Sequence, residues 1–257
     1  MPATTPLLVR PRHLAGPGEV RLITAPLDVA TGWTRTRTPD GVLLYTSPCR
    51  RALVTHEDSG TWTVREYRAP GAEVLWRATF SPGTPSEIAG AFTGTLIDGL
   101  RSVHRDYLEG GPRHQPGSPA STLAQRGWRP DPGPKGFHHQ VSPDGRALYR
   151  HRVGYQPADV ELEGRVPSAW SMLVGDPHRP SWRADFTIGT PFYLLTHAAL
   201  AFSDPAPAKR HLGDIPEHHL PHVTARPASA TAAPSRPQHP ISTPPAVVPS
   251  AAAPRRR

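Results

Sequence analysis

Arginine side chains carry the chemistry that this sequence indicates most directly. Arg35 and Arg37 alternate with threonines, so an extended strand would present both guanidinium groups on one face. Arg65 and Arg77 lie in two further strand-like stretches, and similar arginines recur later in the chain. A guanidinium group donates paired hydrogen bonds to phosphate oxygens, and aromatic neighbours can stack on bases. The candidate nucleic-acid-binding residues are Arg35, Arg37, Arg65, Arg77, Arg129 and Arg183.

The net charge leaves a second interpretation open. The chain has 257 residues and a formal net charge of +8, and Lys135 and Lys209 are its only basic residues that are not arginine. Residues 205–257 hold seven basic and two acidic side chains, so most of the excess charge lies near the C-terminal end. The arginines could therefore belong to an ordinary solvated sheet face. Alternatively, they and the basic C-terminal end contact nucleic acid without sequence specificity.

The sequence contains no recognisable catalytic pattern. It lacks a phosphate-binding loop, a dinucleotide-binding fingerprint, a Gly-x-Ser-x-Gly elbow and a His-Glu-x-x-His motif. Cys49 is the single cysteine, and its basic neighbours would favour a thiolate, but a turn residue is the simpler interpretation. Four histidines between His211 and His222 lack the cysteines and regular spacing of a zinc site. We expect a protein that is not an enzyme, with no cofactor, catalytic residue or metal site.

An internal duplication organises the chain. Residues 47–53 (Ser-Pro-Cys-Arg-Arg-Ala-Leu) recur 95 positions later as residues 142–148 (Ser-Pro-Asp-Gly-Arg-Ala-Leu), with five of seven positions identical. Residues 76–85 recur 106 positions later as residues 182–191, with seven of ten identical. The offset grows because the second copy holds an inserted segment, whose Glu161 and Glu163 we interpret as solvated. Position 49, a cysteine, corresponds to Asp144, which argues further against a catalytic thiol.

All six tryptophans recur in the same order in the two copies, three in each. They alternate with small or polar residues at the period of a strand, which favours a buried sheet face over a ligand-stacking surface. The predicted core of the repeat consists of Trp33, Trp62, Trp76, Phe80, Trp128, Trp170, Trp182 and Phe186.

Each copy predicts strands followed by a helix. In the first copy, strands are expected over residues 41–46, 51–56, 61–67 and 74–80, with a proline turn between the first two. Thr84 to Glu87 resembles a helix capping box, and apolar residues then recur every four positions from Ile88. In the second copy, residues 192–202 are apolar on most sides. Such a helix needs a partner, either the first copy or another chain.

These patterns predict an α+β protein with two tandem repeats of a small antiparallel β-sheet with a C-terminal helix, plus a disordered C-terminal tail. The expected boundaries are 10–109 for the first module, 110–120 for a linker, 121–204 for the second module and 205–257 for the tail. The tail is rich in proline and has no aromatic residue other than histidine, so we expect it to remain unfolded. We expect no secretory signal or membrane span, and a cytoplasmic location.

The repeated motifs also resemble a known family. The Gly-Trp pair, the Ser-Pro-x-x-Arg-Ala turn, the Trp-x-Ala-x-Phe-Ser strand and the Thr-Pro-x-Glu helix start are similar to the SPDY domain. This largely actinobacterial domain of unknown function often occurs as tandem copies. The resemblance covers residues 10–108 and 121–204, and the first copy departs from it with Cys49 and Arg50 in the turn. It implies the tandem layout but no activity, cofactor or catalytic residue.

Two functions remain open from the sequence. The first is a non-catalytic, intracellular binding protein whose tandem modules contact an unknown protein partner, with the apolar helix at 192–202 as the exposed surface. The alternative is a DNA- or RNA-binding accessory protein that uses the arginines and the basic C-terminal end. The sequence does not predict the oligomeric state or how the two modules pack.

Overall fold

The computed structural model describes residues 5–102 and 118–228. The first copy begins with helix α1 (Arg21–Val29), continues with five strands and ends with helix α2 (Ser86–Ser102). Its strands are β2 (Thr34–Arg37), β3 (Leu43–Thr46), β4 (Ala52–His56), β5 (Trp62–Tyr67) and β6 (Val74–Phe80). Strand β6 buries every second side chain, as its alternating sequence predicts.

The second copy repeats this order. Helix α4 (Pro119–Gln125) leads into five strands, and helix α6 (Phe192–Phe202) ends the copy. The strands are β7 (Arg129–Asp131), β8 (Phe137–Val141), β9 (Ala147–Arg152), β10 (Trp170–Asp176) and β11 (Arg179–Phe186). Of the predicted linker, residues 118–120 form the cap and first turn of α4, and residues 110–117 lie outside the described residues.

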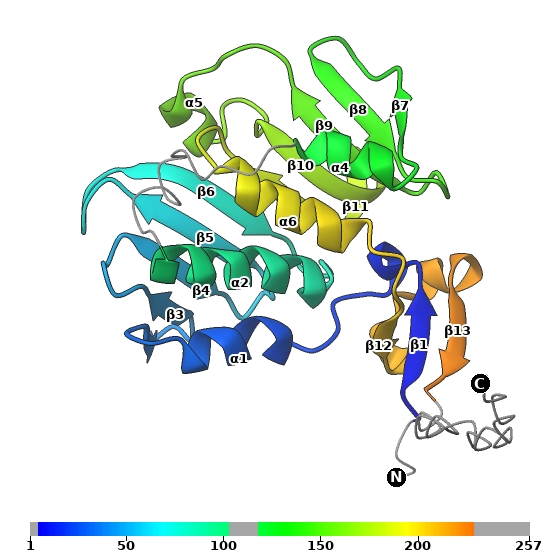
Figure 1. Ribbon diagram of the computed structural model, residues 1–257, viewed down its shortest axis with the longest axis horizontal. Helices are drawn as coiled ribbons and strands as arrows, with labels where there is room; N and C mark the ends of the chain where they lie inside the picture. Colours follow the sequence, from blue (N-terminus) through cyan, green and yellow to red (C-terminus); the bar gives the residue numbers. More distant parts are fainter. Residues whose placement is uncertain (1–4, 103–117, 229–257) are drawn as a thin grey trace, which may run out of the picture.

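The ten strands form one antiparallel sheet, in the order β2-β3-β4-β5-β6-β11-β10-β9-β8-β7 (Figure 1). Each copy supplies one half, and the halves join where β6 pairs with β11. The two sheets expected from the sequence are therefore the halves of a single sheet. Because equivalent strands meet at the junction, the copies are related by a pseudo-twofold axis, as subunits are in a symmetric dimer.

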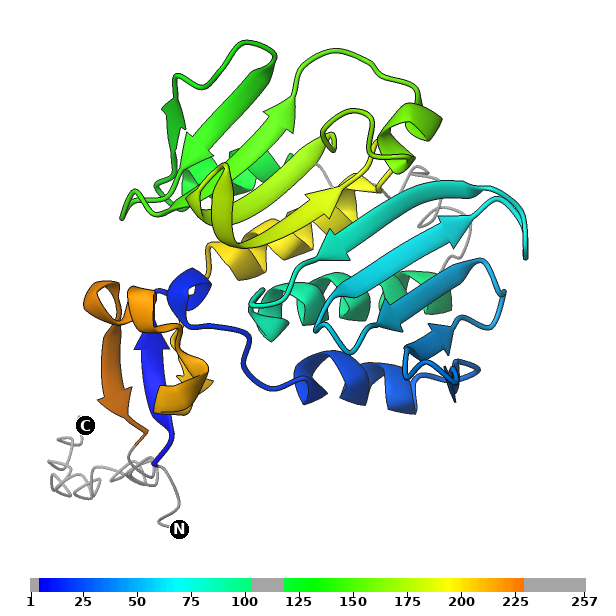
Figure 2. The same cartoon turned by 180° about the vertical axis from the view of Figure 1, so that it is seen from behind.

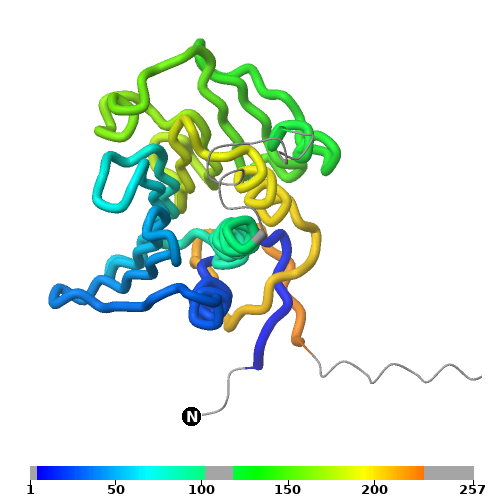
Figure 3. Tube along the Cα trace, turned by 60° about the vertical axis from the view of Figure 1, so that its left-hand side comes forward, coloured from blue at the N-terminus to red at the C-terminus, as the bar shows by residue number. Residues whose placement is uncertain are grey.

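Four helices cover one face of the sheet, in the order α1, α2, α6 and α4. Figure 1 shows them in front of the strands, Figure 3 shows both layers from the side, and Figure 2 shows the face that these helices leave uncovered. Helix α6 is buried on most sides because α2 and α4 pack against it. Its apolar surface is thus satisfied within the chain. Among the described helices, none is long and apolar enough to cross a membrane.

The core lies between the sheet and the helices. Trp62, Trp76, Phe80, Trp128, Trp170, Trp182 and Phe186 are at most 7% exposed, whereas Trp33 is only partly buried. Phe80 and Phe186, equivalent residues of the two copies, meet edge to face with ring centroids 5.6 Å apart. Phe92 of α2 contacts both rings, so a single aromatic cluster spans the junction.

The expectation of an unfolded tail from residue 205 is wrong for residues 205–228. This segment forms β12 (Ala208–Arg210), β13 (Thr224–Pro227) and two 3₁₀ helices, η2 (Leu212–Asp214) and η3 (Glu217–His222). Strand β1 (Leu7–Arg10) pairs with both β12 and β13, which gives a separate three-stranded sheet beside the second copy (Figures 1 and 2). The chain between β1 and the first copy includes η1 (Arg12–Leu14). Residues 229–257 lie outside the described residues.

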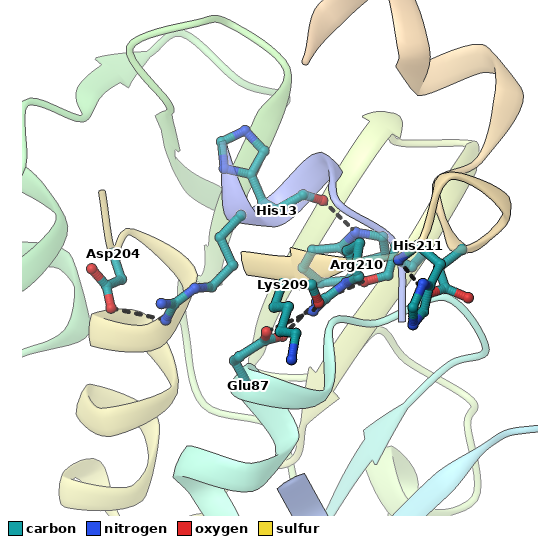
Figure 4. Close-up of polar contacts among 10 residues, drawn as sticks. His13, Glu87, Asp204, Lys209, Arg210 and His211 are labelled. Carbon is teal, nitrogen blue, oxygen red and sulfur yellow. Dashed lines mark hydrogen bonds and ion pairs between the residues drawn. The ribbon is translucent and has the colours of Figure 1, made fainter. Parts of the chain in front are cut away.

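The carboxylate of Glu87 holds the C-terminal addition in place. The Arg210 guanidinium, 1% exposed, donates to both Glu87 oxygens at 2.8 and 2.6 Å, and its other hydrogen bonds go to backbone carbonyls (Figure 4). Glu87 therefore binds the tail and does not complete the predicted capping box. Thr84 Oγ1 instead donates to Ser81 O at 2.8 Å.

The inserted segment of the second copy is also anchored by a buried acid. Helix α5 (Ala158–Leu162) carries Glu161, which is 1% exposed and not solvated as the sequence suggested. Its carboxylate accepts hydrogen bonds from the backbone N–H groups of Ala169 and Ile188, and Arg152 Nη2 lies 3.1 Å away. The insert is thereby fixed against the sheet, where α5 contacts β6. The predicted solvated role fits only Glu163, which is exposed.

Candidate anion-binding face

The uncovered face of the sheet carries a directly opposed pair of arginines. Val64 and Ala78 point into the core, so their neighbours Arg65 and Arg77 point to the uncovered side. The register of β5 and β6 places Arg65 opposite Arg77. Cβ atoms of directly opposed residues lie about 4.5–5.5 Å apart. The two guanidinium groups thus reach the same region of the surface.

This arginine pair lines a hollow of about 340 Å³ near the junction of the copies. Most of the remaining lining residues carry hydroxyl groups, which both donate and accept hydrogen bonds. These hydroxyl residues are Thr61, Thr63, Thr79, Ser168 and Thr187. Guanidinium and hydroxyl donors around one hollow form a donor set suited to an oxoanion such as a phosphate group.

The two opposed arginines of this hollow are not balanced by ion pairs within the described residues. Among the described residues, no carboxylate forms an ion pair with Arg65 or Arg77. Like charges directly opposed on a sheet destabilise it by roughly 0.2–1 kcal/mol. The nearest acids are Glu57, which is exposed and accepts a hydrogen bond from Ser59, and Asp185. An anion placed between the two guanidinium groups would relieve their repulsion.

Asp185 is already engaged on the second-copy side of the hollow. Its Oδ1 atom lies 2.7 Å from Arg183 Nε and accepts a hydrogen bond from Ser171 Oγ at 2.6 Å. Arg150 Nη2 lies at 3.5 Å from the same Ser171 hydroxyl. Burial and the nearby charge of Arg183 lower the pKa of Arg150. Asp185 is thus the one carboxylate in this network, which contains both Arg183 and Arg150. The basic surface therefore extends from β6 across β11 to β9.

The structure brings together only part of the predicted arginine set. Arg65, Arg77 and Arg183 lie on the uncovered face around the junction. Arg129 lies on the same side of the sheet, but it belongs to the edge strand β7 and is exposed. Arg35 and Arg37 share a face, but it is the helix side of the opposite edge, where Arg35 lies 3.4 Å from Asp28 of α1. The six arginines therefore do not share one face of the sheet.

The hydroxyl residues were missed as site residues, although the alternating pattern contained the signal. Thr63 and Thr79 have the same parity in their strands as Arg65 and Arg77, so they share the arginine face. Thr187 was hidden because it contributes from beyond the end of β11. Its Oγ1 accepts a hydrogen bond from Arg77 N at 2.7 Å.

The other candidate groups lie elsewhere. Cys49 is half-buried in its turn, with its Sγ atom 3.2 Å from Ser47 Oγ. Ser181 Oγ lies 2.8 Å from His218 Nε2 and 3.1 Å from His219 Nε2, where η3 packs against β11. Within the described ranges, no group of three or more His, Cys, Asp or Glu side chains is arranged to hold a metal ion.

The chain is a tandem α+β protein: its two copies share one antiparallel sheet, and helices cover one face of that sheet. The sequence matches the SPDY domain, a domain of unknown function (DUF317), over residues 46–100 and 141–208. The chain therefore contains the SPDY domain in two segments, one in each copy, which confirms the resemblance seen in the repeated motifs. Neither the curated proteins nor the solved structures gave a significant match.

Proposed function

We propose that this protein binds nucleic acid through the phosphate groups, using the uncovered sheet face around Arg65 and Arg77. The observation that carries the proposal is the opposed arginine pair, which forms no ion pair within the described residues, at a hollow lined mainly by hydroxyl groups. Arg183 and Arg150 extend this donor surface across the junction. Contacts of this kind fix a protein on the phosphate backbone and carry little base specificity.

The structure weakens the main support for the competing hypothesis of a protein partner at the last helix. That hypothesis depended on an unpaired apolar surface at residues 192–202. Helix α6 places this surface against α2, α4 and the sheet, and eight of its eleven residues are buried. In the described part of the chain, no helix covers the arginine face and no carboxylate forms an ion pair with Arg65 or Arg77, which favours a polyanionic ligand.

The proposal describes a binding role without catalysis, in the cytoplasm, where nucleic acid and a single reduced cysteine are both expected. The four arginines of residues 229–257, which contain no acid, would add a nonspecific electrostatic contact. A chain ending at residue 228 should therefore bind more weakly than the full chain but still bind through the sheet.

Fluorescence anisotropy with a random-sequence oligonucleotide, single-stranded or duplex, tests the proposal. The double variant Arg65→Ala/Arg77→Ala should weaken binding at least tenfold at about 50 mM salt. The matched control, Arg35→Ala/Arg37→Ala, removes the same charge from the helix side of the sheet and should change the affinity less than about threefold. Equal loss in both variants would show that only net charge matters, and no loss in the first would exclude this face.

A further inference from the structure

Both copies form a groove at the same place. In the first copy, Trp33, Pro48, Cys49 and Ile97 line a hollow of about 240 Å³ between the end of α1, the proline turn and the last turns of α2. The repeat offsets relate these four residues to Trp128, Pro143, Asp144 and Ser203. All four equivalents line one hollow in the second copy. The duplication has thus preserved a groove as well as a core.

In the second copy, the N-terminal segment of the chain forms part of the lining of this groove. His13 Nε2 lies 2.9 Å from Asp144 Oδ2, and the imidazole ring meets Trp128 and Phe202 edge to face. The His13 carbonyl accepts a hydrogen bond from Trp182 Nε1 at 2.9 Å. Figure 4 shows the His13 ring pointing away from Arg210 and Glu87, toward the second copy. Pro11 lines the same hollow two residues earlier.

The first copy has the same groove, and within residues 5–102 and 118–228 no segment corresponds to this occupant. Trp33 is only partly buried, whereas its equivalent Trp128 is 4% exposed. Trp76, the equivalent of Trp182, is 1% exposed, and its Nε1 has no hydrogen-bond partner among the described residues. A buried donor without a partner destabilises the fold, so a ligand that accepts from it gains affinity. In the second copy, the carbonyl that accepts from the equivalent donor is that of His13 in the N-terminal segment.

We propose that the groove of the first copy binds a short peptide of a partner protein, in the turn-like form of η1. The segment Pro11–His13 in the equivalent groove gives the form of this peptide: a proline, then two residues later a side chain that enters beside the tryptophan. Cys49 stands where the second copy has Asp144, and Ile97 stands where it has Ser203. The first groove is therefore more apolar, and the entering side chain is of leucine size, not histidine.

One pair of probe peptides and one substitution test this proposal. The probes are fluorescein-labelled copies of residues 8–15, one with the native His13 and one with His13→Leu. The full-length wild-type chain should bind the leucine peptide at least fivefold more tightly. Cys49→Asp, which recreates the Ser-Pro-Asp turn of the second copy, should reverse that preference because the carboxylate can accept from the imidazole.

A second readout uses the only thiol of the chain. The leucine peptide should slow modification of Cys49 by a thiol reagent at least fivefold. Binding of the peptide should also persist in Arg65→Ala/Arg77→Ala, because the groove and the arginine hollow share no lining residue. Absence of binding by both peptides at millimolar concentration, or a preference that Cys49→Asp leaves unchanged, would overturn the proposal.

Discussion

Thr79 and Asp185 occupy the same position in the two copies and are paired with each other across the junction of the sheet. The hydrogen bonds around them obey the same symmetry. Arg183 N donates to Ser81 Oγ at 2.8 Å, and Arg77 N donates to Thr187 Oγ1 at 2.7 Å. In each copy, a hydroxyl group at the equivalent position therefore accepts a hydrogen bond from the backbone N–H of the other copy's arginine. This arrangement places Arg77 and Arg183 symmetrically on the uncovered face, with the pseudo-twofold axis between them.

The Arg210–Glu87 ion pair is expected to stabilise the fold strongly. Arg210→Met should lower the free energy of unfolding by about 3 kcal/mol, because it leaves the Glu87 charge without its partner in a largely buried place. The double variant Arg210→Met/Glu87→Leu should recover most of that loss. Urea unfolding followed by circular dichroism measures both. Wild-type stability in the single variant would show that the pair does not hold the tail.

Truncation at two positions separates the contribution of residues 205–228 from that of residues 229–257. A chain ending at residue 228 keeps β12 and β13 and should melt within about 2 °C of the full chain. A chain ending at residue 204 loses the partners of β1 and exposes Val9 and Leu14. Its melting temperature should fall by about 10 °C or more, equivalent to several kcal/mol. Scanning calorimetry of both truncations is the measurement, and equal melting temperatures would contradict it.

In the two proline turns, introducing a glycine in the first copy and removing one in the second should change the stability in opposite directions. Arg50 has a φ of 59°, in the left-handed region, and its equivalent Gly145 has a φ of 72°. This conformation costs a residue with a Cβ atom roughly 1 kcal/mol. Arg50→Gly should therefore raise the unfolding free energy by about 1 kcal/mol. Gly145→Ala should lower it similarly, although nothing lies within 4 Å of the added Cβ. Urea midpoints that move in the same direction would refute this interpretation.

Two histidines, each stacked on a tryptophan, predict that the fold loses stability in acid. His56 stacks on Trp62 with ring centroids 4.1 Å apart, and the equivalent His151 stacks on Trp170 at 5.5 Å. Burial lowers the pKa of both imidazoles. In the unfolded chain the pKa is about 6.5, so the unfolded state takes up protons first as the pH falls. The free energy of unfolding should therefore decrease below about pH 6.5.

The variant His56→Gln/His151→Gln isolates this contribution from the other histidines. Its loss of stability between pH 7.5 and pH 5.5 should be smaller than that of the wild type. Chemical denaturation at the two pH values gives the difference. An identical loss in both proteins would mean that these two imidazoles do not set the pH dependence.

Local periodicity predicted the individual elements well. The alternation from Val74 predicted strand β6, and the apolar stretch from Phe192 predicted helix α6, both with the observed bounds. The Ser-Pro turn in each copy also forms as expected, because proline and glycine restrict the backbone locally. These features depend on neighbouring residues alone, which is why one sequence was sufficient.

Long-range pairing could not be read from the same patterns. The order of residues 205–228 depends on pairing with β1, about 200 positions away, and on one arginine that reaches Glu87. The alternation of Arg35 and Arg37 showed that they share a face but not which face, since a one-residue shift in register exchanges the two sides. The hollow was unpredictable because its lining comes from both copies, and only the β6–β11 junction brings them together.

The salt dependence of oligonucleotide binding tests the central claim most directly. Each phosphate contact adds about 0.9 to the slope of log affinity against log salt concentration on duplex DNA. Between 50 and 200 mM salt, Arg65→Ala/Arg77→Ala should show a slope smaller by about 2 than that of the wild type, while Arg35→Ala/Arg37→Ala should keep the wild-type slope. A wild-type slope in the first variant, or a wild-type chain that fails to bind at low salt, would contradict phosphate binding at this face.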